Sequence, residues 1–109
     1  MVGVGLFKRR SRDLFTVPEA GTGFRMAVAD VFVITGRGTV VTGTVGSGVV
    51  AVGARVTIER AGRPPLAAEV AGIEMFRRKA VQAGAGDNVG LLFRGLTRDE
   101  ITAGDVVRT

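Results

Sequence analysis

The chain of 109 residues contains no cysteine, histidine, tryptophan or tyrosine, and each absence removes a class of function. Without cysteine there are no disulfides and no thiolate nucleophiles, and without histidine there is no imidazole base. Zinc and other transition metals depend largely on these two residue types, so no metal site is expected. The side chains that could stack against a nucleic-acid base are the six phenylalanines and the arginines. The composition argues against an enzyme with covalent or metal chemistry.

Long hydrophobic runs are missing as well. The apolar stretches are about as long as strands, well short of the ~20 residues that a membrane-spanning helix needs. At the N-terminus an apolar segment, residues 2–7, precedes the basic Lys8, Arg9 and Arg10, which is the reverse of the order in a secretory signal. The lack of cysteine fits a reducing compartment. The sequence predicts a cytoplasmic protein without a membrane partner.

Basic residues outnumber acidic ones by 15 to 10, which gives a net charge of +5. Thirteen of the basic residues are arginine, whose planar fork suits phosphates. RNA or another polyanion is one partner that this balance favours, and a role in solubility alone is the other interpretation. The first basic cluster lies in a segment with several glycines, residues 1–22, and this segment is predicted to be an arm separate from the domain at residues 23–109.

Short strand-like segments follow residue 23. Apolar and polar residues alternate over residues 24–29, and β-branched runs occupy residues 31–35 and 39–45. Further strands are predicted at residues 54–60, 66–76, 89–94 and 105–107 and a helical turn at 97–101. Loops are predicted at 49–53 and 61–65, and a loop or short helical turn at 77–86. Glycine at the corner between the β-branched runs predicts a tight hairpin in which Gly36 or Gly38 has a positive φ. Many short strands without a long helical period predict an all-β barrel.

Two features that could signal chemistry are incomplete. Gly38 and Gly43 have the spacing of a phosphate-binding loop, but Thr44 stands where the lysine would be, so GTP binding and hydrolysis are not expected. Glu74 is a lone carboxylate in an apolar strand, for which hydrogen bonding at an edge or in a pocket is expected rather than catalysis. The chain is therefore not predicted to be an enzyme, and no cofactor is predicted.

A basic triplet, residues 77–79, follows the strand that carries Glu74. Together with the N-terminal cluster it forms a candidate electropositive patch, on which RNA bases could also stack against Phe76 or arginine planes. The other interpretation is a set of scattered, solvated side chains. The members of the predicted basic patch are Lys8, Arg9, Arg10, Arg12, Arg78 and Lys79.

Three motifs occur in order along the chain: GRGTVVTG from Gly36, GIEMF from Gly72 and AGDNVGLLFRG from Ala85. In this order and spacing they resemble domain 2 of elongation factor Tu and related translational GTPases, here as a free-standing domain without the GTPase domain. The resemblance extends over residues 24–107. It implies a six-stranded antiparallel β-barrel of the translation-factor domain 2 type, preceded here by the basic arm.

In that family the barrel helps to hold the 3′ end of aminoacyl-tRNA. The resemblance implies a pocket for the terminal adenine, with apolar side chains around the base, a glycine that permits close approach and a carboxylate that accepts from the ribose or the adenine edge. It also implies that the esterified amino acid lies beside the adenine. The RNA-binding residues implied in this way are Ile34, Gly36, Val40, Glu74, Phe76, Arg77, Asn88 and Leu92.

The leading interpretation is a non-catalytic, translation-factor-like binding module that contacts RNA such as the acceptor end of aminoacyl-tRNA. The alternative is a protein-interaction or structural barrel, associated with the ribosome or another factor, that has lost the RNA site. An open adenine pocket would favour the first interpretation, and side chains that close it would favour the second.

Overall fold

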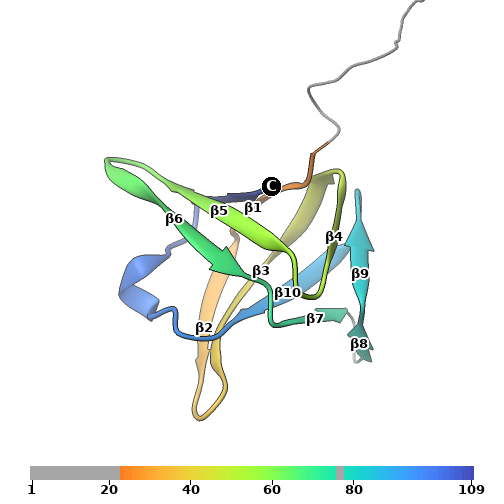
Figure 1. Cartoon of the computed structure of the whole chain (residues 1–109), viewed down its shortest axis with the longest axis horizontal. Coiled ribbons are helices and arrows are strands. Elements are labelled where there is room, and N and C mark those ends of the chain that lie inside the picture. Colours follow the sequence, from red (N-terminus) through yellow and green to blue (C-terminus); the bar gives the residue numbers. More distant parts are fainter. Residues whose placement is uncertain (1–22, 76–77) are drawn as a thin grey trace, which may run out of the picture.

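The chain folds into an all-β domain in the computed structural model, which describes residues 23–75 and 78–109. The helical turn predicted at residues 97–101 is confirmed as a short 3₁₀ helix, η1 (Arg98–Glu100). The described residues contain no helix long and apolar enough to cross a membrane. The predicted arm, residues 1–22, lies outside the described residues, as do Phe76 and Arg77. The strands are β1 (Arg25–Ala27), β2 (Asp30–Ile34), β3 (Gly38–Ser47), β4 (Val49–Ala51), β5 (Arg55–Arg60), β6 (Arg63–Glu69), β7 (Gly72–Met75), β8 (Arg78–Ala80), β9 (Gln82–Gly84), β10 (Asn88–Phe93) and β11 (Val106–Arg108) (Figure 1).

All strand pairs are antiparallel, which confirms the predicted class. Nine strands form one sheet in the order β6-β5-β11-β1-β3-β10-β7-β8, with β2 paired to β3, and β4 and β9 form a second sheet. The strands curl around a common core (Figure 1), but their ladders stop short of a closed ring. Single backbone hydrogen bonds prolong two of the ladders, β5–β6 by the bond from Gly53 N to Val70 O at 2.7 Å and β4–β9 by the bond from Val52 N to Val81 O at 3.0 Å.

Several strands lie where the sequence predicts loops. β4 and β9 fall within the predicted loops at residues 49–53 and 77–86, and they pair with each other. Their partners are far apart in the chain, so no local pattern signals them. Pro64 and Pro65 belong to β6 and not to a turn. β6 pairs with β5 alone, and an edge strand tolerates residues that lack an N–H group.

The single strand predicted at residues 66–76 is divided into β6 and β7. The division follows from a change of partner between two consecutive peptide units. Val70 N donates to Ala54 O at 2.9 Å, whereas Ala71 N donates to Leu92 O at 2.8 Å. The chain therefore bends away from β5 and continues beside β10, which brings β7 to the face described below.

The hairpin of β2 and β3 has the tight turn that the sequence predicts. Gly36 has φ 78° and Gly38 has φ 141°, so the predicted positive φ is confirmed at both positions. Arg37 N donates to Ile34 O at 2.9 Å and closes the turn. In Figure 1 the hairpin extends from the body of the domain, with its tip at the lower edge of the view.

One core fills the space between the curled strands. Its largest fully buried side chains include Phe24, Met26, Ile58, Leu91 and Phe93, which come from both halves of the nine-stranded sheet. The alternation of buried and more exposed residues along β1 and the first four residues of β5 follows the period of two that a half-buried strand requires. The remaining, outward-facing side chains of each strand are available to form a site.

Candidate binding cleft

The outward face of β2, β3, β10, β7 and β8 carries a row of mostly polar side chains. Residues directly opposite each other in an antiparallel pair lie on the same face, so the pairing register defines the row. Asp30 lies opposite Thr42, Thr42 opposite Gly90, Gly90 opposite Glu74, and Glu74 opposite Lys79. Five residues from five strands are thus aligned across the sheet, with a glycine at the centre.

A second row, of apolar side chains, lies beside the first and is displaced from it by two residues in each strand. Phe32 lies opposite Val40, Val40 opposite Leu92, and Leu92 opposite Gly72. Leu92 is 7% exposed, whereas Phe32, at the free end of the row, is 50% exposed. The outward face therefore has an apolar strip beside a polar one.

Two glycines leave a hollow in this face, Gly90 in the polar row and Gly72 in the apolar row. A Cβ atom at Gly90 would lie 3.1 Å from Val40 Cγ1, and one at Gly72 would lie 3.6 Å from Leu92 Cβ. The missing side chains leave an open cavity of about 340 Å³, which we call the outer-face cleft. Its larger lining side chains are apolar or charged: Ile34, Val40, Val52, Ile73, Val81 and Leu92, with Arg37, Glu74, Lys79 and Arg94.

The structure brings four of the predicted RNA-binding residues together in the outer-face cleft: Ile34, Val40, Glu74 and Leu92. Asn88 lies in a neighbouring shallow depression of about 560 Å³ that shares Val40, Glu74 and Gly90 with the cleft, and its Oδ1 accepts a hydrogen bond from the Thr44 hydroxyl. Gly36 lies at the hairpin turn and lines a third depression instead of the cleft. Phe76 and Arg77 lie outside the described residues.

The predicted basic patch is divided by the alternation of β8. Lys79 lies opposite Glu74 and lines the cleft. Arg78 lies opposite Met75 and therefore points to the other face of the ribbon. Of the described members of the patch, Lys79 alone reaches the cleft, and the four N-terminal members lie outside the described residues.

The lining residues that sequence reasoning missed include Arg37, Val52 and Val81. Arg37 stands between two glycines, and its place in the tight hairpin turn was the available signal. Val52 and Val81 fall in segments predicted as loops, and they meet because Val52 N bonds to Val81 O. Both valines are exposed, by 44% and 78%, and form an apolar rim beside the cleft.

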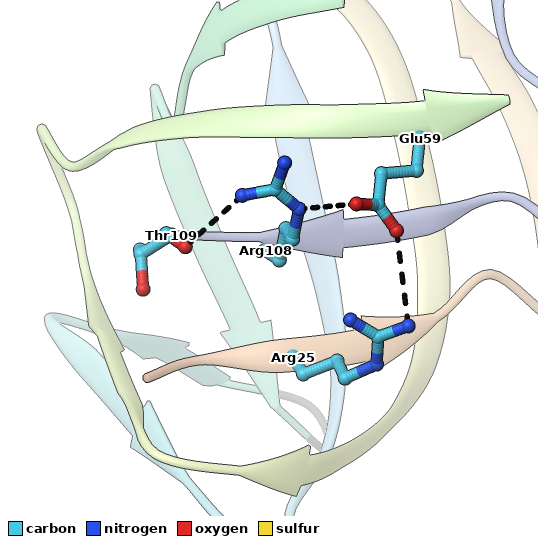
Figure 2. Close-up of polar contacts among 4 residues, drawn as sticks. All are labelled: Arg25, Glu59, Arg108 and Thr109. Carbon is cyan, nitrogen blue, oxygen red and sulfur yellow. Dashed lines mark hydrogen bonds and ion pairs between the residues drawn. The ribbon is translucent and has the colours of Figure 1, made fainter. Parts of the chain in front are cut away.

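Arginines on the opposite half of the sheet are placed differently from those at the cleft. Figure 2 shows Glu59 of β5 between Arg108 of β11 and Arg25 of β1. Arg108 Nε donates to Glu59 Oε2 at 2.5 Å, and Arg25 Nη2 lies 3.7 Å from Glu59 Oε1. Their charge is therefore partly neutralised within the fold.

Comparison with known families identifies one family whose model covers most of the strands that build the cleft. The family model described as Elongation factor Tu domain 2 matches residues 38–108, from the start of β3 to the end of β11. Of the strands whose side chains form the two rows, β2 alone lies outside the match. Domain 2 of that factor is a non-catalytic β domain of the translation apparatus, and this chain belongs to the elongation factor Tu domain 2 family.

Proposed function

We propose that this chain is a non-catalytic module that binds the 3′ end of a single-stranded RNA, such as the acceptor end of aminoacyl-tRNA, in the outer-face cleft. One observation carries the proposal. Ile34, Val40, Glu74 and Leu92 come from four strands and line one open cavity. They are residues that the family resemblance connects with the terminal adenine. Among residues 23–75 and 78–109 no side chain fills the cavity, which favours a retained pocket over a lost one.

The chemistry of the lining suits a nucleoside. Ile34, Val40 and Leu92 offer apolar contacts to a base, and the bare backbone at Gly90 lets the base approach the sheet. Glu74 can accept hydrogen bonds from ribose hydroxyls or from an amino group of the base. Unstacked bases at RNA ends are commonly recognised through such contacts to their faces and edges.

Phosphates of the same strand would meet the positive side chains at the rim. Lys79 and Arg94 line the cleft, and both are exposed. If each neutralises one phosphate of a single strand, the logarithm of the affinity should fall with the logarithm of salt by about 0.7 per contact. Lys79→Gln and Arg94→Gln should then each flatten the salt dependence by about that amount.

The decisive variant blocks the cleft without altering the fold. We expect the full chain to bind an RNA oligonucleotide with a 3′-terminal adenosine, and Val40→Arg to abolish this binding. Val49→Arg is the matched control, because Val49 is 60% exposed on β4 and does not line the cleft. Fluorescence anisotropy at low salt measures both variants. Equal binding by Val40→Arg and the unaltered chain would contradict the proposal.

The N-terminal cluster requires a separate test, since basic residues bind polyanions by themselves. A variant in which glutamine replaces all four basic residues, Lys8, Arg9, Arg10 and Arg12, should bind RNA more weakly. It should still require a 3′-terminal adenosine. If this variant loses all binding while Val40→Arg keeps it, the arm binds the RNA and the cleft does not.

The apolar rim favours a second candidate, a protein-interaction module of the translation apparatus. Val52 and Val81 extend the apolar lining of the cleft outward over exposed surface. An apolar side chain from a protein partner would fill the cleft as well as a base does. Failure of the full chain to bind any RNA oligonucleotide at low salt would make this the better proposal. Both roles place the protein in the cytoplasm, which cell fractionation tests.

A further inference from the structure

In the part of the chain that the structure describes, three strands of the nine-stranded sheet pair on one side only, and two of them carry protecting residues. An exposed strand edge invites pairing with another strand, and proteins commonly block it with proline or charge. Within the described residues, β6 contains Pro64 and Pro65, and β8 contains Arg78 and Lys79. Both edges therefore have the features that prevent strand addition.

The third edge, β2, has no such protection beyond its first residue. Phe32, Val33 and Ile34 are consecutive, apolar and exposed, by 50%, 55% and 39% respectively. Because neighbouring residues of a strand point to opposite faces, the exposure affects both faces of the hairpin. A run of three exposed apolar residues on an unpaired edge is costly in water unless it meets a partner.

A groove of about 470 Å³ lies between the hairpin tip and the segment that leads into η1. Its lining includes Val33 and Gly36 from the hairpin and Leu96 from the other wall. Arg37, Arg94 and Arg98 also line it, and none of the described carboxylates does. An acidic side chain on an extended segment would therefore favour binding of that segment in the groove.

We propose that two copies of this chain associate through their β2 edges, antiparallel and centred on Val33. In this register Val33 lies opposite its counterpart, and Phe32 lies opposite Ile34 of the second copy. Cross-strand pairs between aromatic and β-branched residues, and between two β-branched residues, are favourable in antiparallel sheets. A two-fold axis through Val33 uses the same surface on both copies, which gives a closed dimer.

The same register supplies the acidic side chain that the groove favours. β2 ends at Ile34 and residues 35–37 form the turn, so Asp30 of one copy lies beyond the last strand pair, level with the hairpin turn of the other copy. Arg37 of that turn lines the groove, so the carboxylate comes close to a positive side chain of the second copy. A parallel arrangement would instead place Asp30 beside its counterpart. Charge and apolar pairing therefore favour the same antiparallel register.

The dimer has a consequence for the outer-face cleft. Edge-to-edge pairing makes the ribbons of the two copies one continuous sheet. The outward faces of both copies then lie on the same side of that sheet, with the two clefts on either side of the two-fold axis. The inference does not depend on what the cleft binds.

Sedimentation equilibrium on the full chain tests the proposal. We expect twice the monomer mass at high concentration, and the monomer mass for Val33→Lys at the same concentration. Val49→Lys is the matched control, because Val49 is an exposed valine of β4 that lines neither the cleft nor the groove, and its variant should remain dimeric. Far-UV circular dichroism verifies that each variant is folded. A wild-type chain that stays monomeric up to about 1 mM would overturn the proposal.

A charge reversal distinguishes this interface from any other. Asp30→Arg and Arg37→Asp should each raise the dimer Kd about tenfold, and the two together should restore it. Restoration would not occur if the residues acted independently. A dimer that persists in Val33→Lys and ignores both charge variants would show that the copies associate through another surface.

Discussion

Gly36 and Gly38 flank one arginine in the hairpin turn, but their surroundings differ. Both have φ values that side chains rarely adopt, 78° and 141°. A Cβ atom at Gly36 would meet open space, whereas one at Gly38 would collide with the backbone carbonyl oxygen of Phe93. The sequence predicts that glycine is required at this corner. It does not predict which position is tighter, because Phe93 lies far away in the chain.

We predict that Gly36→Ala lowers the free energy of unfolding by about 1 kcal/mol, the usual cost of a positive φ for a residue with a Cβ atom. Gly38→Ala should cost clearly more, because the backbone of β10 must also move. Urea denaturation followed by circular dichroism measures both variants. Equal losses would show that the contact with Phe93 relaxes without cost.

At the scale of elements, the sequence Ala-Gly-Asp occurs before both β10 and β11, and it folds the same way each time. Asp87 Oδ2 accepts from Gly84 N at 2.9 Å, and Asp105 Oδ2 accepts from Thr102 N at 2.9 Å. In return the aspartate N–H groups donate to the carbonyls of the same residues, at 3.0 and 3.1 Å. The intervening glycines, Gly86 and Gly104, have φ of 90° and 96°. The repeated motif is thus a turn that starts a strand.

We predict that Asp105→Ala costs about 1–3 kcal/mol of stability, since it leaves a partly buried N–H group without its acceptor. Asp105 is 6% exposed, so water cannot readily replace the carboxylate. Asp105→Asn should recover much of the loss because it keeps an acceptor oxygen. Asp99→Ala, at an exposed position in η1, serves as the control and should change stability by less than about 0.5 kcal/mol. Thermal and urea unfolding of the three variants test this, and a loss for Asp99→Ala as large as for Asp105→Ala would contradict it.

The strands that the sequence predicts correctly are those with their own signal. β3 and β10 have β-branched or leucine-rich runs bounded by turn residues, and β5 alternates with period two. β4, β8 and β9 have three residues each, and pairing with distant partners defines them. A local pattern cannot contain that information. The same limit hid Val52 and Val81 from the predicted site.

At the scale of the whole molecule, β3, β7 and β10 build the core with one side and the outer-face cleft with the other. Ile34, Val40, Glu74 and Leu92 could be named together from the resemblance alone. Their common cavity depends on register, on Gly90 and Gly72 as gaps in the rows, and on the bend between β6 and β7. Each of these is a property of paired strands, so the sequence predicts the members of the cleft better than its boundary.

The division between core and cleft can be tested on two neighbouring leucines of β10. Leu91 is fully buried in the core that both halves of the nine-stranded sheet share, whereas Leu92, which is 7% exposed, lies outside that core and lines the cleft. Leu91→Ala should cost about 2–5 kcal/mol, because it leaves a cavity among packed side chains. Leu92→Ala should cost less, since it enlarges a cleft that is already open.

A single shared core also implies that the domain unfolds as one unit. In Leu91→Ala the urea midpoint should fall while the slope m stays the same, with coincident transitions for circular dichroism and for binding of an RNA oligonucleotide in the cleft. In Leu92→Ala the urea midpoint should change little, whereas RNA binding should fall strongly. Comparable stability losses for the two leucines would show that the cleft wall is as tightly packed as the core. In that case the cavity would be too rigidly filled on its β10 side to accept a base.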